Sequence, residues 1–228
     1  MAGSTPQSSN DMDAHAREIE KRAAAEAAAE LVCDGDRVGL GTGSTVAYLL
    51  PALAARGLTI RCAATSPATE SIARELGLSI EPLAELGELD IAIDGADQVA
   101  PDGWLVKGGG GAHTREKVIA AAARRFVVIA SSDKLVDALR PPVPLEILVF
   151  AASVTLSALE PAALRDCPLS PDGNLIADYL GRVDDPAAVA SWLSATPGVV
   201  EHGLFPPALV SDVLVADGSA VRQIRLAS

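Results

Sequence analysis

"RVGLGTGSTVAYLLPALAARG", residues 37–57, passes from an apolar strand through a glycine-rich turn into a helix. We expect the helix to open at Ser44, to kink or break at Pro51, and to stop at Gly57, because proline lacks an amide hydrogen and glycine readily takes a left-handed conformation. A strand and a helix joined by a tight turn form the repeating unit of a parallel sheet. This segment therefore predicts an α/β protein.

Strands and helices alternate on both sides of this segment. The helix expected at 66–77 has the clearest ends: Ser66 caps it, Pro67 occupies its first position and Gly77 closes it. The alternation favours a parallel, doubly wound sheet. The other expected strands are 58–65, 89–94 and 126–131, and the other expected helices are 13–33, 114–125 and 133–139.

The composition changes at "RPPVPLEILVFA", residues 140–151, where three prolines precede an apolar strand. Such a shift indicates a domain boundary. At the end of the chain, a pair of strands around Asp217-Gly218 is expected to form a hairpin that returns to the first sheet. Between the boundary and the hairpin, the pattern predicts a small α+β module with a helix near 153–165, a turn and strand at 170–180, and a helix at 186–195.

Composition restricts the classes of partner. The 228 residues carry a net charge of −12, which argues against nucleic acid and anionic membranes but allows an anionic small molecule in a locally positive pocket. The three cysteines form no Cys-x-x-Cys motif, so neither a disulfide framework nor a zinc site is indicated. The polar N-terminus does not resemble a signal peptide, and no apolar run is long enough to span a membrane. We expect a cytoplasmic protein with a disordered tail of about ten residues.

The turn "GLGTGST", residues 39–45, is a candidate anion site. Backbone N–H groups at a helix N-terminus bind anions, and Thr42, Ser44 and Thr45 add hydroxyl groups. The turn does not match the dinucleotide fingerprint, because the sixth position counted from Gly39 is serine, and it lacks the Gly-Lys of a nucleotide-binding P-loop. A phosphate monoester fits better than NAD or ATP. The alternative is an ordinary turn with a serine cap.

A second motif, "DGADQ" at 94–98, follows the strand expected at 89–94. Ligands of parallel sheets bind at the carboxyl ends of the strands. Asp94 and Asp97 lie in a tight turn that Gly95 and Ala96 permit, so both carboxylates are candidates to face one pocket and hold sugar hydroxyls. Alternatively, Asp94 caps the turn and Asp97 is solvated.

The third motif is "KGGGGAHTREK", residues 107–117. Lys107 supplies a cation beside a bare backbone. Glu116 falls in the first turn of the next helix if Thr114 is its N-cap, and there the helix dipole and Arg115 are expected to keep it ionised, as a base requires. The alternative is a flexible glycine loop followed by solvated charges. His113 is interpreted as structural, because the histidines form no cluster suited to a metal.

Together the three junctions predict a pocket for a polyhydroxylated phosphate ester, with acid–base chemistry and no cofactor or metal. In order and spacing, "GLGTGST", "DGAD", "KGGGGAHTREK" and "SSDKLVDAL" closely resemble ribose-5-phosphate isomerase of type A. The resemblance extends to "PPVPLEILVF", "DGNLIAD" and "PGVVEHGLF", and so covers most of the chain.

The resemblance implies interconversion of D-ribose 5-phosphate and D-ribulose 5-phosphate through a cis-enediolate, in the non-oxidative branch of the pentose phosphate pathway. It also implies a homodimer or homotetramer. The fold expected is α/β, with a Rossmann-like parallel-sheet catalytic domain at 1–140 and 207–228 and a second, smaller α+β (ferredoxin-like) domain at 141–206.

Roles for individual residues follow from the same resemblance. Glu116 matches the proton-transferring base. Of the four glycines, Gly108 to Gly110 are expected to matter, whereas relatives often carry alanine at Gly111. The other matches are Lys107 with the amides of Gly108, Gly109 and Gly110 at the reacting carbonyl; Asp94, Gly95, Ala96 and Asp97 for sugar binding and ring opening; Thr42, Gly43, Ser44 and Thr45 for the phosphate; and Lys134 and Lys21 as further basic residues near the substrate.

Two features depart from the family pattern. Gln98 stands where the family usually has glutamate, and the segment 152–174 is shorter than usual and lacks the usual basic and Gly-Gly features. The principal alternative function is a non-catalytic sugar-phosphate sensor, although only about 36 residues precede the first strand, too few for a typical DNA-binding module. A lactonase or acyl-transfer enzyme would need a nucleophile or a histidine base in the pocket.

Overall fold

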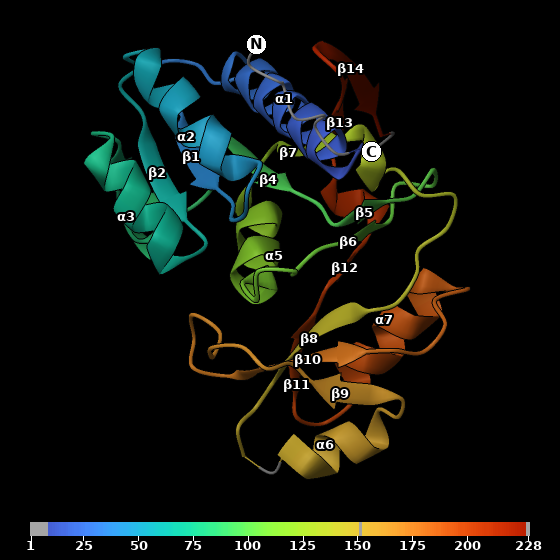
Figure 1. Ribbon diagram of the computed structural model, residues 1–228. Helices are drawn as coiled ribbons and strands as arrows, with labels where there is room; N and C mark the ends of the chain where they lie inside the picture. The colour runs from blue at the N-terminus through green and yellow to red at the C-terminus, as the bar shows by residue number, and fades with distance from the viewer. Residues whose placement is uncertain (1–8, 151, 227–228) are drawn as a thin grey trace, which may run out of the picture.

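A seven-stranded sheet forms the larger part of the molecule, in the strand order β14-β13-β7-β4-β1-β2-β3 (Figure 1). The computed structural model describes residues 9–150 and 152–226, so the expected N-terminal tail falls largely outside it. Neighbouring strands are parallel except β13 and β14. The predicted α/β class is confirmed. The strands are β1 (Arg37–Leu40), β2 (Arg61–Ala64), β3 (Ser79–Ile80), β4 (Ile91–Gly95), β7 (Phe126–Ser131), β13 (Asp212–Asp217) and β14 (Ala220–Arg225).

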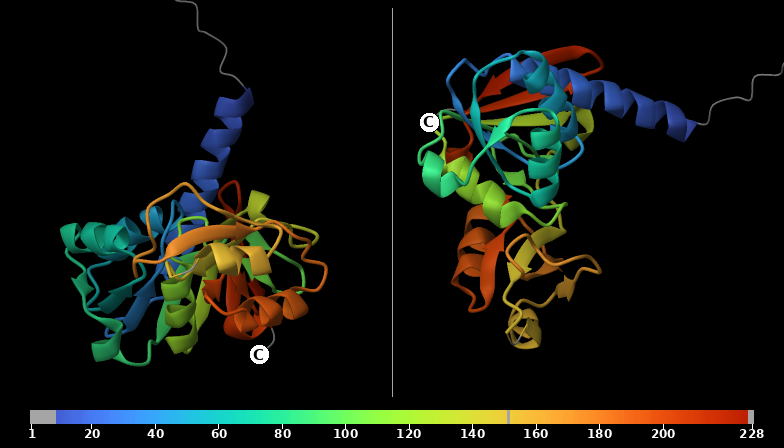
Figure 2. Two further views of the ribbon diagram at one scale, coloured as in Figure 1. Left: turned by 90° about the horizontal axis from the view of Figure 1, so that it is seen from below. Right: turned by 90° about the vertical axis from the view of Figure 1, so that its left-hand side faces the viewer.

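Helices cover both faces of this sheet, because strand side chains alternate between two hydrophobic clusters. Along β7, Val127 and Ile129 pack in the cluster of α1 and α2, whereas Phe126 and Val128 pack in that of α5. The first turns of α1 project past the rest of the molecule (Figure 2). The helices are α1 (Ser9–Ala29), α2 (Val46–Ala55), α3 (Pro67–Glu75), α4 (Leu83–Leu86) and α5 (His113–Ala122), with a 3-10 turn, η1 (Ser132–Lys134).

A smaller, antiparallel sheet of order β11-β8-β10-β9 lies below the large one in Figure 1. It has its own hydrophobic cluster, which includes Leu145, Ala177 and Leu193. The segment is thus an α+β unit, as expected, and the division at residues 140/141 and 206/207 stays a prediction. Its elements are β8 (Val143–Ile147), α6 (Ala152–Ala158), β9 (Ala162–Leu164), β10 (Leu175–Tyr179), α7 (Pro186–Ala195) and β11 (Val199–His202).

A three-stranded sheet of short strands connects the two larger ones. It consists of β5 (Gln98–Val99), β6 (Leu105–Val106) and β12 (Leu204–Phe205), in the order β12-β6-β5. Directly beside it, the Lys107 N–H donates to the carbonyl of Gly203 at 2.8 Å. The segment that leaves the small sheet is therefore bonded to the chain entering the glycine loop.

Several expected boundaries are confirmed. The Ser66 hydroxyl accepts a hydrogen bond from Thr69 N, and Pro67 is the first residue of α3. The terminal strands form a hairpin around Gly218, which has a φ of 58°, and β13 pairs with β7 in the large sheet. None of the helices in residues 9–150 and 152–226 combines the length and apolar character that crossing a membrane requires.

Other expectations are wrong. The helix α2 begins at Val46, not at Ser44, and it is not broken at Pro51, because its buried leucines hold it against the sheet core. The helix expected at 133–139 is only the turn η1; beyond it, Val136 N donates to the Val99 carbonyl. The helix expected at 153–165 ends at Ala158, before Pro161. The 3-10 turn η2 (Pro207–Leu209) and the short β3, α4 and three-stranded sheet were not predicted.

Candidate active site

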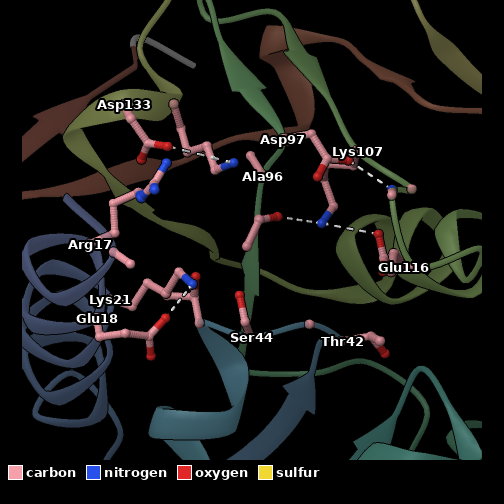
Figure 3. A pocket seen from close by; sticks show the side chains of 18 residues that line it. Arg17, Glu18, Lys21, Thr42, Ser44, Ala96, Asp97, Lys107, Glu116 and Asp133 are labelled. Carbon is pink, nitrogen blue, oxygen red and sulfur yellow. Dashed lines mark hydrogen bonds and ion pairs between the residues drawn. The ribbon is translucent and has the colours of Figure 1, made fainter. Parts of the chain in front are cut away.

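A cavity of about 510 Å³ opens at the carboxyl edge of β1 and β4, where the three sequence motifs meet (Figure 3). Its walls come from segments far apart in the chain. They are Ala14, Arg17, Glu18 and Lys21 of α1; Thr42, Gly43, Ser44 and Thr45; Gly95, Ala96 and Asp97; Lys107, Gly108, Gly109 and Gly110; Glu116; and Asp133 and Lys134. Every predicted site residue except Asp94 lines this cavity.

The turn after β1 is shaped to hold an anion. Thr45 is the N-cap of α2, and Gly43 has a φ of 114°, a conformation that favours glycine. The Thr42 hydroxyl is paired with the Thr65 hydroxyl at 2.6 Å, so it is already engaged. The backbone of residues 43–45 and the hydroxyls of Ser44 and Thr45 remain as groups for a ligand.

Asp94 and Asp97 take different positions. Asp94, at the end of β4, is 3% exposed, and its Oδ1 accepts from Thr42 N at 3.1 Å and Gly95 N at 2.7 Å. Asp97 is exposed, lines the cavity and accepts from Gly109 N at 2.8 Å. A Cβ at Gly41 would lie 1.9 Å from Asp94 Oδ1. Gly41 was not predicted as a site residue, and its bare backbone is what lets Asp94 reach the turn.

Lys107 lies between two carboxylates. Its Nζ is 2.8 Å from Asp94 Oδ2 and 3.0 Å from Glu116 Oε2, and it also donates to the Gly95 carbonyl. Burial by itself would lower the pKa of Lys107, but Asp94 and Glu116 outweigh burial and raise this pKa above its ordinary value. The lysine is therefore a fixed cation at the base of the cavity.

Glu116 is held in an environment that favours its neutral form. Burial and the charge of Asp94 raise its pKa to about 8, although Lys107 opposes the shift. Burial likewise raises the pKa of Asp94 against the effect of Lys107. The expectation that the helix dipole and Arg115 keep Glu116 ionised is wrong, because burial of the side chain disfavours its charged form. A carboxyl group with this pKa is a stronger base than an exposed glutamate.

The first turn of α5 is anchored to the small sheet. Its N-cap is Ala112, not Thr114 as expected; the Thr114 hydroxyl donates to Glu146 on β8 instead. Arg115 pairs with Asp172 at 2.7 Å.

Lys117 completes this anchoring. Its Nζ donates to Glu201 at 2.6 Å and to the His202 carbonyl at 2.7 Å. The neighbours of Glu116 on both sides are thus fixed to the small α+β unit, while Glu116 itself points into the cavity (Figure 3).

The four glycines serve different steric needs. A Cβ at Gly108 would lie 2.7 Å from His113 Nδ1, and one at Gly109 would lie 2.9 Å from Asp97 Oδ1. Gly111 has a φ of 73°, a conformation that favours glycine, so the loop of this chain depends on a fourth glycine beside the three that were expected to matter. At Gly110 the nearest atom to a Cβ is Thr42 Cγ2 at 3.6 Å, an ordinary contact.

His113 is fully buried beneath this loop, consistent with the structural role expected for it. Gln98, the departure from the family pattern, points away from the cavity. Its side-chain amide donates to the Arg140 carbonyl and accepts from Arg140 N, both at 2.8 Å. A glutamate at this position could accept the hydrogen bond from Arg140 N, but as a carboxylate it could not donate one to the Arg140 carbonyl.

Basic residues of α1 extend the site beyond the predicted set. Lys21 lines the cavity as expected and pairs with Glu18 at 2.7 Å. Arg17, one helical turn earlier, also lines it and was missed, as was Asp133 (Figure 3). The four-residue spacing of Arg17 and Lys21 is the only sequence signal that would have grouped them. Lys134 of η1 lines the cavity as well, with its Nζ 3.9 Å from Asp133 Oδ2.

Known proteins resemble this chain along most of its length. The family described as ribose 5-phosphate isomerase A (phosphoriboisomerase A) matches residues 61–220. The ribose-5-phosphate isomerase A of Caulobacter vibrioides is 43% identical over 222 residues, covering 90% of this chain and 97% of that protein. The protein of that name from Methanosarcina acetivorans is 46% identical over 201 residues, covering 82% of this chain and 86% of that protein.

The fold agrees with the sequence match. The solved structure of ribose 5-phosphate isomerase A from Methanocaldococcus jannaschii has a TM-score of 0.85 to this one, at 35% identity, and covers 90% of this chain and 97% of its own. The sequence motifs, the family match and the shared fold agree. The chain belongs to the ribose 5-phosphate isomerase A family.

Proposed function

We propose that this protein interconverts D-ribose 5-phosphate and D-ribulose 5-phosphate, with Glu116 as the base. The observation that carries the proposal is the buried Lys107 between Asp94 and Glu116, at one end of a cavity whose other end is an anion-binding turn. A relative at 35% identity, a D-ribose-5-phosphate isomerase, is described in complex with phospho-erythronic acid. That compound carries a phosphate and a carboxylate at opposite ends, which matches the two ends of this cavity.

In the proposed reaction the Glu116 carboxylate removes the proton from C2 of the open-chain aldose. The electron pair of the broken C–H bond forms the C1–C2 double bond, and negative charge moves to O1. Glu116 then returns the proton to C1, while a proton passes from the O2 hydroxyl to O1 and leaves the ketone at C2. One carboxyl group serves both steps because the two carbons are adjacent.

The charge that develops on oxygen requires fixed donors. Lys107 and the amides of Gly108, Gly109 and Gly110 are proposed to supply them, in a site where burial strengthens each interaction. Asp94 holds Lys107 in its charged form. Asp97, the exposed carboxylate, is proposed to hold the sugar hydroxyls and to assist ring opening.

The phosphate is proposed to bind at the other end of the cavity. The backbone of residues 43–45 and the hydroxyls of Ser44 and Thr45 face it there, and Lys21, Arg17 and Lys134 supply positive charge in an otherwise acidic protein. Helix N-termini and cations both favour a phosphate dianion.

We further propose a cytoplasmic homodimer or homotetramer that serves the pentose phosphate pathway. Exposed apolar side chains on the small unit support self-association: Val149 is 58% exposed, Phe150 is 87% exposed and Val154 is 69% exposed. Neither nucleic acid nor a membrane is proposed as a partner, because the net charge is −12.

A coupled assay with ribose 5-phosphate tests the proposal. We expect turnover by the wild type without added nucleotide or metal, and a loss of about 10²–10⁴-fold in kcat for Glu116→Gln. Glu75→Gln, at an exposed position on α3, is the matched control and should retain full activity. Tight binding of ribose 5-phosphate without turnover by the wild type would instead identify a sugar-phosphate sensor.

A further inference from the structure

The carbonyl groups of the glycine loop are bound by an arginine from the small sheet. Arg165 directly follows β9, and its Nη1 donates to the carbonyl of Gly108 at 3.2 Å and to that of Gly109 at 3.0 Å. Arg165 does not line the cavity but a separate hollow, which Gly109, Gly110 and Gly111 also line. Arg165 therefore contacts the loop from outside the cavity.

The guanidinium group is itself held in place. Its Nε donates to Asp178 Oδ2 at 3.0 Å, and its Nη2 donates to Asp178 Oδ1, so the two side chains form a fork-to-fork pair. The Arg165 backbone N–H donates to the Ile176 carbonyl on β10 at 2.9 Å. An arginine paired in this way presents its remaining N–H groups in a fixed plane.

The contacts with the two carbonyls determine where the amides point. In a trans peptide the C=O of one residue and the N–H of the next point in opposite directions. With the Gly108 and Gly109 carbonyls turned to Arg165, the N–H groups of Gly109 and Gly110 point the other way. Gly109 N–H meets Asp97 Oδ2 at 2.8 Å on the cavity side. Among the described residues, the Gly110 N–H has no protein acceptor.

Glycine alone does not select this orientation. The loop includes φ values of 103° at Gly108 and 73° at Gly111, and a run of glycines has many other accessible conformations. Oxyanion donors are effective when they are oriented before the reaction begins. A loop without side chains needs this restraint from outside itself.

We infer that Arg165 is a positioning residue, which turns the peptide planes of Gly108 and Gly109 so that the next two amides face the reacting end of the substrate. The inference rests on the proposed isomerisation. Asp178 aligns Arg165, so the small sheet contributes to the chemistry without touching the substrate. Because Arg165 contacts the loop carbonyls and does not line the cavity, substrate affinity should depend little on it.

Kinetics of Arg165→Met test the inference. We expect kcat to fall by about 10- to 100-fold while KM stays within about threefold. Misorienting an oxyanion donor should cost only part of the rate that deleting the donor would cost. Asp178→Asn should show a smaller loss in the same direction. Arg182→Met is the matched control: Arg182 pairs with Asp184 on the same unit but is 86% exposed, and its kcat should be unchanged.

Two readouts separate positioning from a general loss of structure. Arg165→Met should bind phospho-erythronic acid more weakly than the wild type by about the factor lost in kcat, while inorganic phosphate binds equally well to both. Added guanidinium ion should restore part of the activity of Arg165→Ala. Thermal unfolding identifies any variant that has lost its fold. If Arg165→Met has lost its fold, Arg165→Lys is used instead, because lysine keeps a donor but cannot form the two-point pair with Asp178.

A folded Arg165→Met with wild-type kcat, or an equal loss in Arg182→Met, would overturn the inference. That result is distinct from failure of the proposed function, which would appear as a wild-type protein that does not convert ribose 5-phosphate.

Discussion

Lys107 Nζ lies 3.0 Å from Glu116 Oε2, and these two side chains are 2% and 4% exposed. With Asp94 on the other side of the lysine, two buried carboxyl groups share one cation. Burying the second negative charge is unfavourable, so the cluster retains a proton at a pH where exposed carboxyl groups have lost theirs.

The contribution of Glu116 to the stability of the protein should fall as the pH rises from about 4.5 to about 8. The pKa of Glu116 is raised from 4.5 to about 8 in the folded state, so the folded protein binds more protons than the unfolded chain in this interval. Chemical denaturation at pH 5, 7 and 9 measures the slope. Relative to Glu116→Gln, the wild type should lose stability as the pH rises over this interval, and an unchanged difference between the two proteins would mean that Glu116 titrates normally.

The same pKa predicts the pH dependence of the proposed reaction. The base acts as its carboxylate, so kcat/KM should increase with pH through about 8 in the free protein. A rise centred near pH 4.5 would contradict this prediction. Initial rates in a series of buffers at constant ionic strength provide the measurement.

Replacement of Lys107 should affect catalysis more than binding. For Lys107→Ala we expect kcat to fall by about 100- to 1000-fold with KM changed by only a few-fold, because the lysine acts on charge that develops during the reaction. The variant should also be destabilised, since Asp94 and Glu116 lose their shared cation.

A double substitution at Lys107 and Asp94 separates the loss of catalysis from the loss of stability. Lys107→Met combined with Asp94→Asn should regain much of the lost stability and none of the activity. An active double variant would exclude the proposed role of the lysine.

Two glycine substitutions should affect the thermal stability and the kinetics of the protein differently. Gly41→Ala places a Cβ 1.9 Å from Asp94 Oδ1, so it should lower Tm and activity together. Gly110→Ala meets only Thr42 Cγ2 at 3.6 Å, so Tm should change little, whereas KM should rise because the methyl group lies at the cavity wall. If Gly110→Ala kept the wild-type KM, the substrate would not approach this residue.

Lys21 should contribute to phosphate binding. Lys21→Gln is expected to raise KM by about tenfold at low salt with little change in kcat, and the difference should shrink as salt screens the charge. Arg22→Gln is the control, because Arg22 lies over the Tyr48 ring and not in the cavity. Equal effects of the two substitutions would indicate a general charge effect.

The sequence predicted those parts of the site that depend on local backbone. The residues from Asp94 to Glu116 form two strand-end turns and a helix start, each with a recognisable pattern, and the turn at 42–45 has another. Their meeting in one cavity follows from the rule that the carboxyl ends of parallel strands share an edge.

The missed features depend on contacts between distant segments. Gly203 shows this: a Cβ there would lie 2.1 Å from the Lys107 carbonyl oxygen, yet nothing around residue 203 signals it. Arg165 reaches the glycine loop in the same manner. The ionisation of Glu116 was misjudged for a related reason, since burial is a property of the assembled fold. Pro51 shows that packing also overrides local rules.

The position of β13 also has a consequence for synthesis on the ribosome. β13 lies between β7 and β14, and the Gly218 N–H in the final hairpin donates to Glu20 on α1 at 3.2 Å. The strand β7, whose six residues are all buried in the finished sheet, emerges long before residues 212–217. A nascent chain thus carries an apolar strand with an open edge, which invites pairing with other chains. Residues 212–217, which are translated later, close that edge.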